Sequence, residues 1–276
     1  MRRPLIILLG ILVLCLIVAV ILLRQPGEVS SSGTTGDTIA RFDSASIDRI
    51  EIRGRTGAAV LEKQADGWML IAPMRYQADP AAVAEALSRA RRSEVKNIVS
   101  TNPAKQSLFD VDTSGTLVTL SGGGASEAFR VGKTSPSFTE TYVRREGSND
   151  VLLVDGLLSS VFARAPGEWR DRTIFSAPMG SITSVGFHFG DTAFVLTLAD
   201  SLWKVDGAAA QGQAVQTFLA ALSSLQADTF VDTAVASMPR LTCTIEVQGT
   251  RISFFWNAAA SRYDVVTSRS PQIFTL

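Results

Sequence analysis

The sequence predicts an α+β protein: a single N-terminal transmembrane helix, then a tandem duplicated module of mainly antiparallel sheet with one helix per copy. Three observations lead to this prediction. They are a long apolar run without charge, short strand patterns separated by hairpin-length turns, and a set of motifs that recurs at a nearly constant offset. The chain has 276 residues, 46% of them hydrophobic, which allows one large domain or two small ones with real cores.

The first element is a membrane anchor that runs from Leu5 to Leu23 and contains no charged side chain. A helix of this length spans about 28 Å, close to the roughly 30 Å of bilayer hydrocarbon. A cleaved signal peptide and lipidation at Cys15 are the alternatives. The first would have a shorter apolar region and a small-residue cleavage site, and the second would need a small residue where Leu14 stands. We therefore expect residues 1–24 to form an uncleaved anchor that lies in the lipid bilayer.

Basic residues around this run predict its orientation. Arg2 and Arg3 precede it and Arg24 alone follows closely, so the positive-inside rule favours a cytoplasmic N-terminus and an extracytoplasmic main part. Without these three arginines, 23 basic residues stand against 26 acidic ones. A nucleic-acid-binding protein should carry a clear basic excess, so we expect no nucleic acid partner.

The remaining chain divides into a linker and two domains. Residues 25–42 are rich in Pro, Gly, Ser and Thr, and this composition predicts a flexible linker. The sequence predicts a first α+β repeat over residues 43–172. A second repeat, shortened at its C-terminal end, is expected over residues 173–276.

The repeat is visible in strands that carry a tryptophan. Residues 46–52 alternate polar and apolar side chains, as a half-buried strand does, and residues 181–187 do the same 135 positions later. Trp68 recurs as Trp203 at the same offset, each in a short strand after a turn. We expect both tryptophans to anchor a core.

A helix follows in each copy. Asp79 is a suitable N-cap and Pro80 suits the first helical position. The apolar stripe of the first helix consists of Val83, Leu87 and Ala90, and that of the second consists of Val215, Leu219, Leu222 and Leu225.

Short strand patterns follow each helix and are separated by turns rich in Gly, Ser, Asn and Asp. In the first copy they cover residues 117–120, 129–131, 141–143 and 151–154. In the second copy they cover residues 242–247, 252–256, 263–266 and 273–276. Turns of hairpin length predict antiparallel pairing, with the helix on one face of each sheet.

Several short motifs also occur in a characteristic order over residues 43–235. They are Asp79-Pro80, Leu108-Phe109-Asp110-Val111, Phe129-Arg130-Val131-Gly132, Tyr142-Val143-Arg144 and Trp169-Arg170-Asp171-Arg172. Together with the N-terminal span, this order is similar to that of the bacterial family known as domain of unknown function 4340. The resemblance implies a membrane-anchored envelope protein of a kind often linked with ABC-transporter-like or gliding-type export components, and it supplies no catalytic residue. We expect the anchor to lie in the bacterial inner membrane.

The motifs that could carry chemistry fall short of the patterns they need. Gly132-Lys133-Thr134 resembles the end of a phosphate-binding loop, but Glu127 stands where that loop needs Gly. One His and two Cys cannot form a Cys/His zinc cluster, and Asp110 with Asp112 gives too few ligands for calcium. The sequence contains no Gly-x-Ser-x-Gly motif, which would supply a nucleophilic serine for a catalytic His188. We therefore expect no catalytic residue, cofactor or metal, and no enzyme.

Two clusters are candidates for interaction. Arg89, Arg91, Arg92 and Lys96 crowd the C-terminal half of the first predicted helix, whereas residues 220–227 of the second copy contain no basic side chain. The cluster is either a solvated face that complements the negative helix end or a docking surface for an acidic partner. Trp169, Arg170, Asp171 and Arg172 link the copies and predict an inter-repeat clamp of ion pairs around a Trp.

The sequence thus favours a membrane-anchored, extracytoplasmic, non-catalytic accessory or binding subunit with membrane-protein partners, of an ABC-type transport or cell-envelope complex. A scaffold that binds an envelope polymer or lipid is the alternative. An envelope hydrolase whose carboxylates lie between the copies is the least favoured one.

Overall fold

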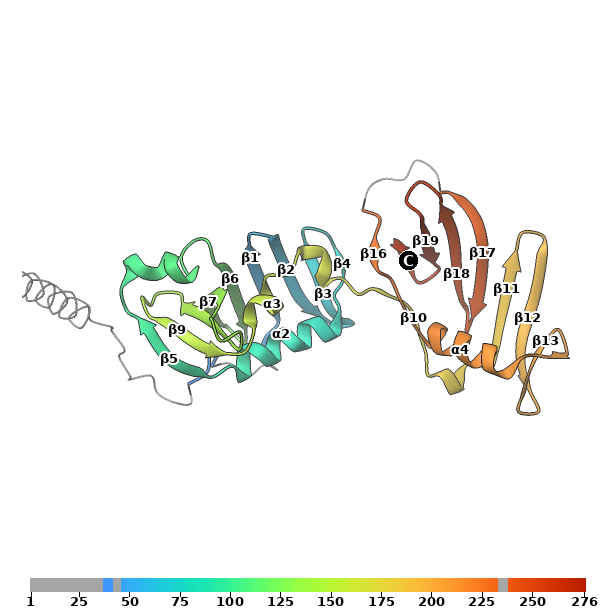
Figure 1. Ribbon diagram of the computed structural model, residues 1–276, viewed down its shortest axis with the longest axis horizontal. Coiled ribbons are helices and arrows are strands. Elements are labelled where there is room, and N and C mark those ends of the chain that lie inside the picture. The colour runs from blue at the N-terminus through green and yellow to red at the C-terminus, as the bar shows by residue number, and fades with distance from the viewer. Residues whose placement is uncertain (1–36, 42–45, 233–237) are drawn as a thin grey trace, which may run out of the picture. The chain divides into compact units, whose positions relative to one another are not determined.

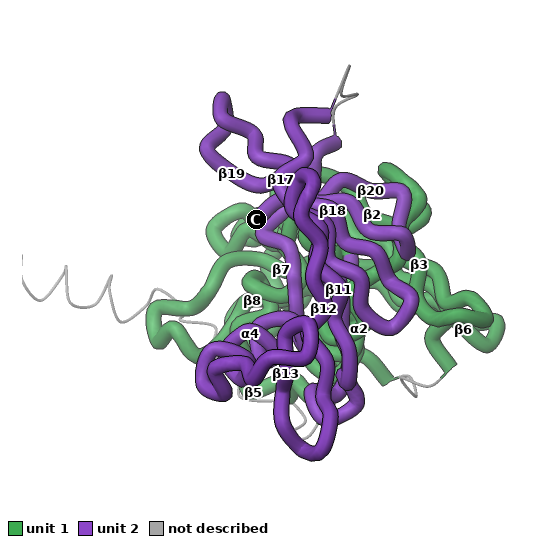
Figure 2. The backbone as a smooth tube through the Cα atoms, turned by 90° about the vertical axis from the view of Figure 1, so that its right-hand side faces the viewer, with its two compact units in different colours: residues 1–170 green, residues 171–276 purple. Residues whose placement is uncertain are grey.

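The computed structural model describes residues 37–41, 46–232 and 238–276. The chain forms two compact units, Met1–Arg170 and Asp171–Leu276 (Figures 1 and 2). The predicted anchor over residues 1–24 and the linker up to residue 36 lie outside the described residues. Within the described ranges, none of the helices combines the length and apolar character that a bilayer crossing needs. The unit boundary falls two residues before the predicted domain boundary.

Unit 1 is built on a nine-stranded antiparallel sheet in the order β4-β3-β2-β1-β6-β7-β8-β9-β5 (Figure 1). Its strands are β1 Arg49–Gly54, β2 Gly57–Gln64, β3 Gly67–Ala72, β4 Tyr76–Gln77, β5 Val95–Ser100, β6 Thr116–Gly122, β7 Ala125–Thr134, β8 Glu140–Arg145 and β9 Val151–Asp155. Pairing through short turns joins most neighbours, and this confirms the mainly antiparallel α+β class.

Unit 2 has its own nine-stranded antiparallel sheet, in the order β14-β13-β12-β11-β17-β18-β19-β20-β16. Its strands are β11 Ser184–Phe189, β12 Thr192–Ala199, β13 Leu202–Val205, β14 Ala208–Ala209, β16 Thr229–Phe230, β17 Arg240–Val247, β18 Thr250–Asn257, β19 Arg262–Thr267 and β20 Ser270–Thr275. A separate pair joins β10 Thr173–Ser176 to β15 Ser224–Gln226. Strand for strand in chain order, the two large sheets have the same topology.

The main helix of unit 1, α2 Pro80–Arg92, begins where the sequence predicts. The Asp79 carboxylate accepts hydrogen bonds from the backbone N–H groups of Ala81 at 2.8 Å and Ala82 at 3.3 Å. These bonds satisfy two of the amide groups that a helix N-terminus leaves without partners. The helix buries Val83 and Ala90 on the sheet side, as their spacing indicates.

The main helix of unit 2, α4 Gly212–Ser223, buries Val215, Leu219 and Leu222. The prediction for Leu225 is wrong, because the helix ends at Ser223 and Leu225 lies in β15. One helix per copy is also an incomplete description. Shorter helices are α3 Leu158–Phe162, η2 Pro103–Phe109, η3 Pro166–Trp169 and η4 Met179–Ser181.

The core of unit 1 lies between its sheet and the helices α2 and α3. Trp169 is its largest fully buried side chain, and Trp68 packs against the core while partly buried. Full burial of one large apolar side chain contributes about 1.5–3 kcal/mol. Trp203 in unit 2 is also only partly buried.

The described residues 37–41 belong to unit 1, although they fall in the range predicted as a flexible linker. Ile39 and Ala40 are buried, and their backbone N–H groups donate to Ser93 and Ala90 at the end of α2. Burial of these two apolar side chains is the physical reason why the domain starts earlier than its Pro/Gly/Ser composition indicates.

Candidate functional site

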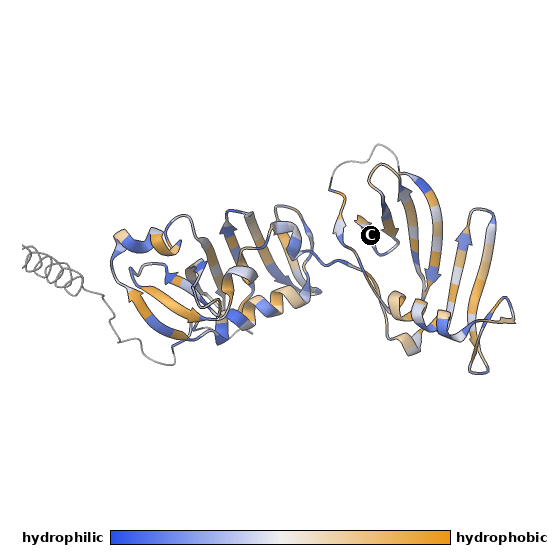
Figure 3. Cartoon of the chain, in the orientation of Figure 1, coloured by the Kyte–Doolittle hydropathy of each residue, from blue (hydrophilic) through white to orange (hydrophobic). Residues whose placement is uncertain are grey.

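The first candidate is the α2 basic surface, formed by Arg89, Arg91, Arg92 and Lys96. All four side chains are exposed. The predicted place of Lys96 on the helix is wrong, because α2 ends at Arg92 and Lys96 lies in β5. Its ammonium group lies 3.5 Å from the carboxylate of Glu94. In the part of the chain that the structure describes, the three arginines form no ion pair. Figure 3 shows hydrophilic and hydrophobic residues alternating along α2, as expected for a helix with one face on the core.

The electrostatics of α2 leave this surface positive. Arg89, Arg91 and Arg92 occupy the last turn, where the helix macrodipole favours cations by about 0.3–1 kcal/mol each. Glu85 is the one acidic residue of the helix, and it forms an ion pair with Arg164 instead. The last turn of α4 carries no basic residue. The two units therefore differ in charge at this position.

The predicted inter-repeat clamp is divided between the units. Trp169 and Arg170 are buried in unit 1, where the Arg164 guanidinium lies 5.4 Å from the Trp169 ring and that of Arg170 lies 5.8 Å from the Tyr76 ring.

In unit 2, Asp171 accepts a hydrogen bond from the Thr173 backbone N–H at 2.9 Å, and Arg172 donates to the carbonyl oxygen of Asp228 at 3.2 Å. Each half of the motif thus has partners in its own unit, and a clamp between the units stays a prediction.

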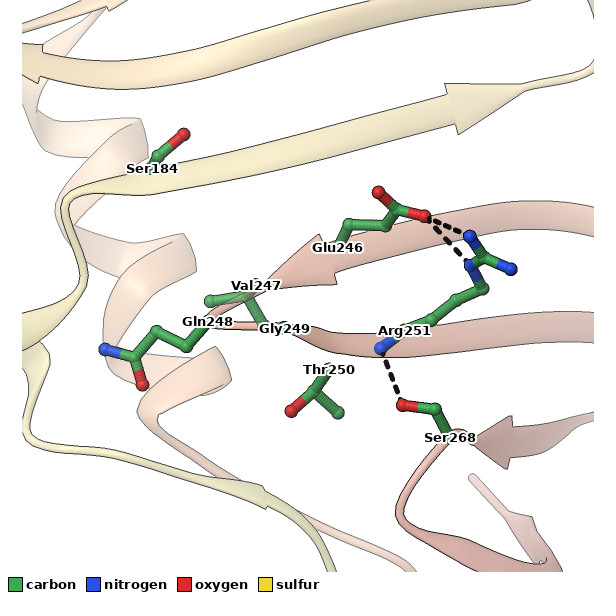
Figure 4. A pocket seen from close by; sticks show the side chains of 8 residues that line it. All are labelled: Ser184, Glu246, Val247, Gln248, Gly249, Thr250, Arg251 and Ser268. Carbon is green, nitrogen blue, oxygen red and sulfur yellow. Dashed lines mark hydrogen bonds and ion pairs between the residues drawn. The ribbon is translucent and has the colours of Figure 1, made fainter.

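A polar cavity of about 420 Å³ lies beside the β17–β18 turn of unit 2 (Figure 4). Glu246 and Arg251 form a two-fold contact at 2.8 Å, and the Arg251 backbone N–H donates to Ser268 at 3.0 Å. Thr250 is buried. Because the charges of Glu246 and Arg251 neutralise each other, this cavity presents polar groups without net charge.

A second cavity in unit 2, of about 500 Å³, is lined by Gly190, Arg240, Leu241, Thr242, Trp256 and Tyr263. Trp256 is 43% exposed and Tyr263 is 37% exposed, and their rings meet at 5.0 Å in an edge-to-face arrangement. We call these six residues the Trp256 surface. The sequence did not predict this surface, because the aromatic run 254–256 in β18 does not indicate which ring is exposed.

Gly132-Lys133-Thr134, which resembles the end of a phosphate-binding loop, lies in strand β7. Gly132 is buried in β7, and a Cβ atom there would lie 2.2 Å from the carbonyl oxygen of Phe109. Glycine is therefore required by close packing. Lys133 and Asp110 line a neighbouring cavity of about 250 Å³, where the Asp110 carboxylate lies 3.6 Å from the Arg55 guanidinium.

Asp112 has a turn role. Its carboxylate accepts hydrogen bonds from the Ser114 hydroxyl at 2.6 Å and the Ser114 backbone N–H at 3.0 Å, and these bonds hold the pKa of Asp112 below its usual range. Among the described residues, no three His, Cys, Asp or Glu side chains are placed to hold a metal. His188 is exposed on β11, and burial raises the pKa of the Cys243 thiol.

Residues 68–241 match the protein family described as Domain of unknown function (DUF4340). The match covers more than half of the chain. The chain belongs to this family. The order of short motifs had indicated the same membership, which is thereby confirmed.

The DUF4340 range begins in β3 and ends in β17, so it includes α2 with its basic surface and the Trp169 motif. No curated protein and no solved structure matches the chain.

Proposed function

We propose that this chain is a membrane-anchored, extracytoplasmic accessory or binding subunit of an envelope or ABC-type transport complex, which binds a partner without transforming it. The observation that carries the proposal is the α2 basic surface. Three exposed arginines share one helical turn there and form no ion pair within the described residues.

The balance of charge at this surface favours an acidic partner. The helix end offsets part of the positive charge, but three adjacent guanidinium groups also repel one another in the free protein. An acidic partner would remove this repulsion and form charge-assisted hydrogen bonds, for which the guanidinium geometry is well suited. Such complementarity raises association rates and specificity more than affinity.

We also propose that the chain arose from a tandem duplication, and that its first copy specialised for binding at α2. The shared strand order of the two sheets supports the duplication. The basic last turn of α2 against the uncharged last turn of α4 supports the specialisation. The N-terminal apolar run and the basic residues before it support anchoring with this module outside the cytoplasm.

The experiment is affinity purification of the full chain from detergent-solubilised membranes, compared with the triple variant Arg89→Glu, Arg91→Glu, Arg92→Glu. We expect a membrane protein to co-purify with the wild type in fixed proportion and to be lost from the variant. The matched control is Arg251→Glu, an exposed arginine of unit 2, which should retain the partner. Recovery of a clean monomer from the wild type would contradict the proposal. Retention on peptidoglycan or liposomes instead would favour the scaffold alternative.

A further inference from the structure

In unit 1, the segment after the last strand of the sheet covers one end of that sheet. Helix α3 packs against β6, β7, β8 and α2. It buries Leu158, Val161 and Phe162, and the Phe162 ring meets the Phe129 ring of β7 at 5.7 Å. One and a half turns of apolar helix therefore close this part of unit 1.

Polar contacts fix the position of that helix. The Thr141 hydroxyl of β8 accepts a hydrogen bond from the Leu158 backbone N–H at 2.9 Å. The hydroxyls of Ser159 and Thr134 lie 3.0 Å apart, at the end of β7. In the β1–β2 turn, Thr56 donates to the carbonyl oxygen at the end of α3 at 3.1 Å. Three places on the sheet thus hold α3: the end of β7, the start of β8 and the β1–β2 turn.

The counterparts of these three places in unit 2 line the Trp256 surface. Thr134 pairs with Thr141 across β7 and β8, and Trp256 pairs with Tyr263 across β18 and β19, which occupy the same positions in the sheet order. Gly190 lies in the β11–β12 turn, the counterpart of the β1–β2 turn. The cavity of about 500 Å³ is therefore the counterpart of the site that α3 fills in unit 1.

This site is apolar and open in the described part of unit 2. Leu241 is 50% exposed, beside the exposed rings of Trp256 and Tyr263. Contiguous exposed apolar side chains of this kind mark interaction sites in soluble domains. Arg240 is the cross-strand neighbour of Trp256, and its exposed guanidinium adds positive charge to the rim.

We propose that the Trp256 surface binds a short amphipathic helix of a partner protein, in the place that α3 takes in unit 1. The helix is expected to carry an acidic residue opposite Arg240. In unit 1, Ser159 of α3 lies beside Thr134. The counterpart of Thr134 in unit 2 is Trp256, which is the cross-strand neighbour of Arg240. An acidic residue at the position of Ser159 in a bound helix would therefore lie close to Arg240.

The inference rests on the proposed binding function and names a second surface for it. This surface shares no residue with the α2 basic surface, so the co-purification experiment and the test below can fail separately.

The test uses a fluorescent peptide with the sequence of residues 155–165 and Glu in the place of Ser159, titrated with the full-length protein in detergent. We expect saturable binding by fluorescence anisotropy. Trp256→Glu should weaken it roughly tenfold or more, because a central aromatic anchor is lost. Leu202→Glu is the matched control, since Leu202 is 62% exposed on β13 outside the cavity, and it should bind as the wild type does.

A charge exchange tests the predicted orientation. Arg240→Glu should bind the Glu peptide more weakly and a peptide with Lys at that place more tightly. Circular dichroism checks that each variant is folded. Absence of saturable binding, or equal binding by Trp256→Glu, would overturn the proposal. A dimer of the purified protein that Trp256→Glu dissociates would overturn it in favour of a second copy as the occupant.

Discussion

Asp37 illustrates how one residue joins the start of the described chain to the domain. Its carboxylate lies 3.1 Å from the Arg41 guanidinium and 2.9 Å from that of Arg145 in β8. The hydrogen bond from Arg41 is the main cause that lowers the pKa of Asp37, and Arg145 adds to it against the opposing effect of burial.

This lowered pKa predicts a pH dependence of stability. A carboxyl with a depressed folded-state pKa contributes stability above its unfolded pKa of about 3.9, and the contribution is lost as the pH falls through the folded value. We expect Asp37→Asn to lower the melting temperature at pH 7, and the gap to the wild type to close toward pH 2. A gap of equal size at both pH values, measured by thermal circular dichroism, would show that the ion pairs are not its cause.

At the scale of the element, α2 depends on its cap. Asp79→Ala removes the side-chain acceptor of two amide groups and should lower the free energy of unfolding by about 1 kcal/mol. Urea denaturation measures this difference. Asp66→Ala is the control, because Asp66 lies exposed in the β2–β3 turn and should change stability by less than about 0.5 kcal/mol. Equal effects of the two substitutions would contradict the capping role.

The start of α2 could be predicted from the sequence, whereas the place of Leu225 could not. Asp79 and Pro80 act locally, so their residue types alone placed the start of α2 correctly. Leu225 fits the helical spacing, but it lies in β15 instead, where it pairs with β10, more than 45 residues earlier in the chain. A pattern within one helix contains no information about such a distant partner.

The Trp256 surface could not be predicted for a related reason. Residues 254–256 are three aromatics in a row, so alternation does not indicate which ring faces the core. A register shift between Leu241 and Cys243 further changes which residues of β17 share a face with β18. The face of Trp256 therefore depends on backbone geometry that side-chain type does not encode.

For the whole molecule, the recurring Trp68 and Trp203 strands led us to expect two repeats, and the chain forms two compact units whose large sheets share one strand order. The two-residue strands β4, β14 and β16 were not predicted, since they are too short to show alternation. The α2 basic surface was visible in the sequence because its four residues lie within eight positions of one another along the chain. The Trp256 surface joins four segments of chain and appears only in the folded unit.

In the proposed function, a membrane-anchored protein presents the α2 basic surface to a partner outside the cytoplasm. This is tested by the rate at which a membrane-impermeant maleimide labels Glu94→Cys in intact spheroplasts and in purified protein, with Gln213→Cys on α4 as the control. The Glu94 side chain is 57% exposed and lies next to the α2 basic surface in the chain. The Glu94→Cys variant keeps all four basic residues of that surface. We predict that both cysteines label without lysis, and that only Glu94→Cys labels several-fold more slowly in spheroplasts than when purified. Labelling that requires lysis, or equal rates in the two preparations, would contradict the account.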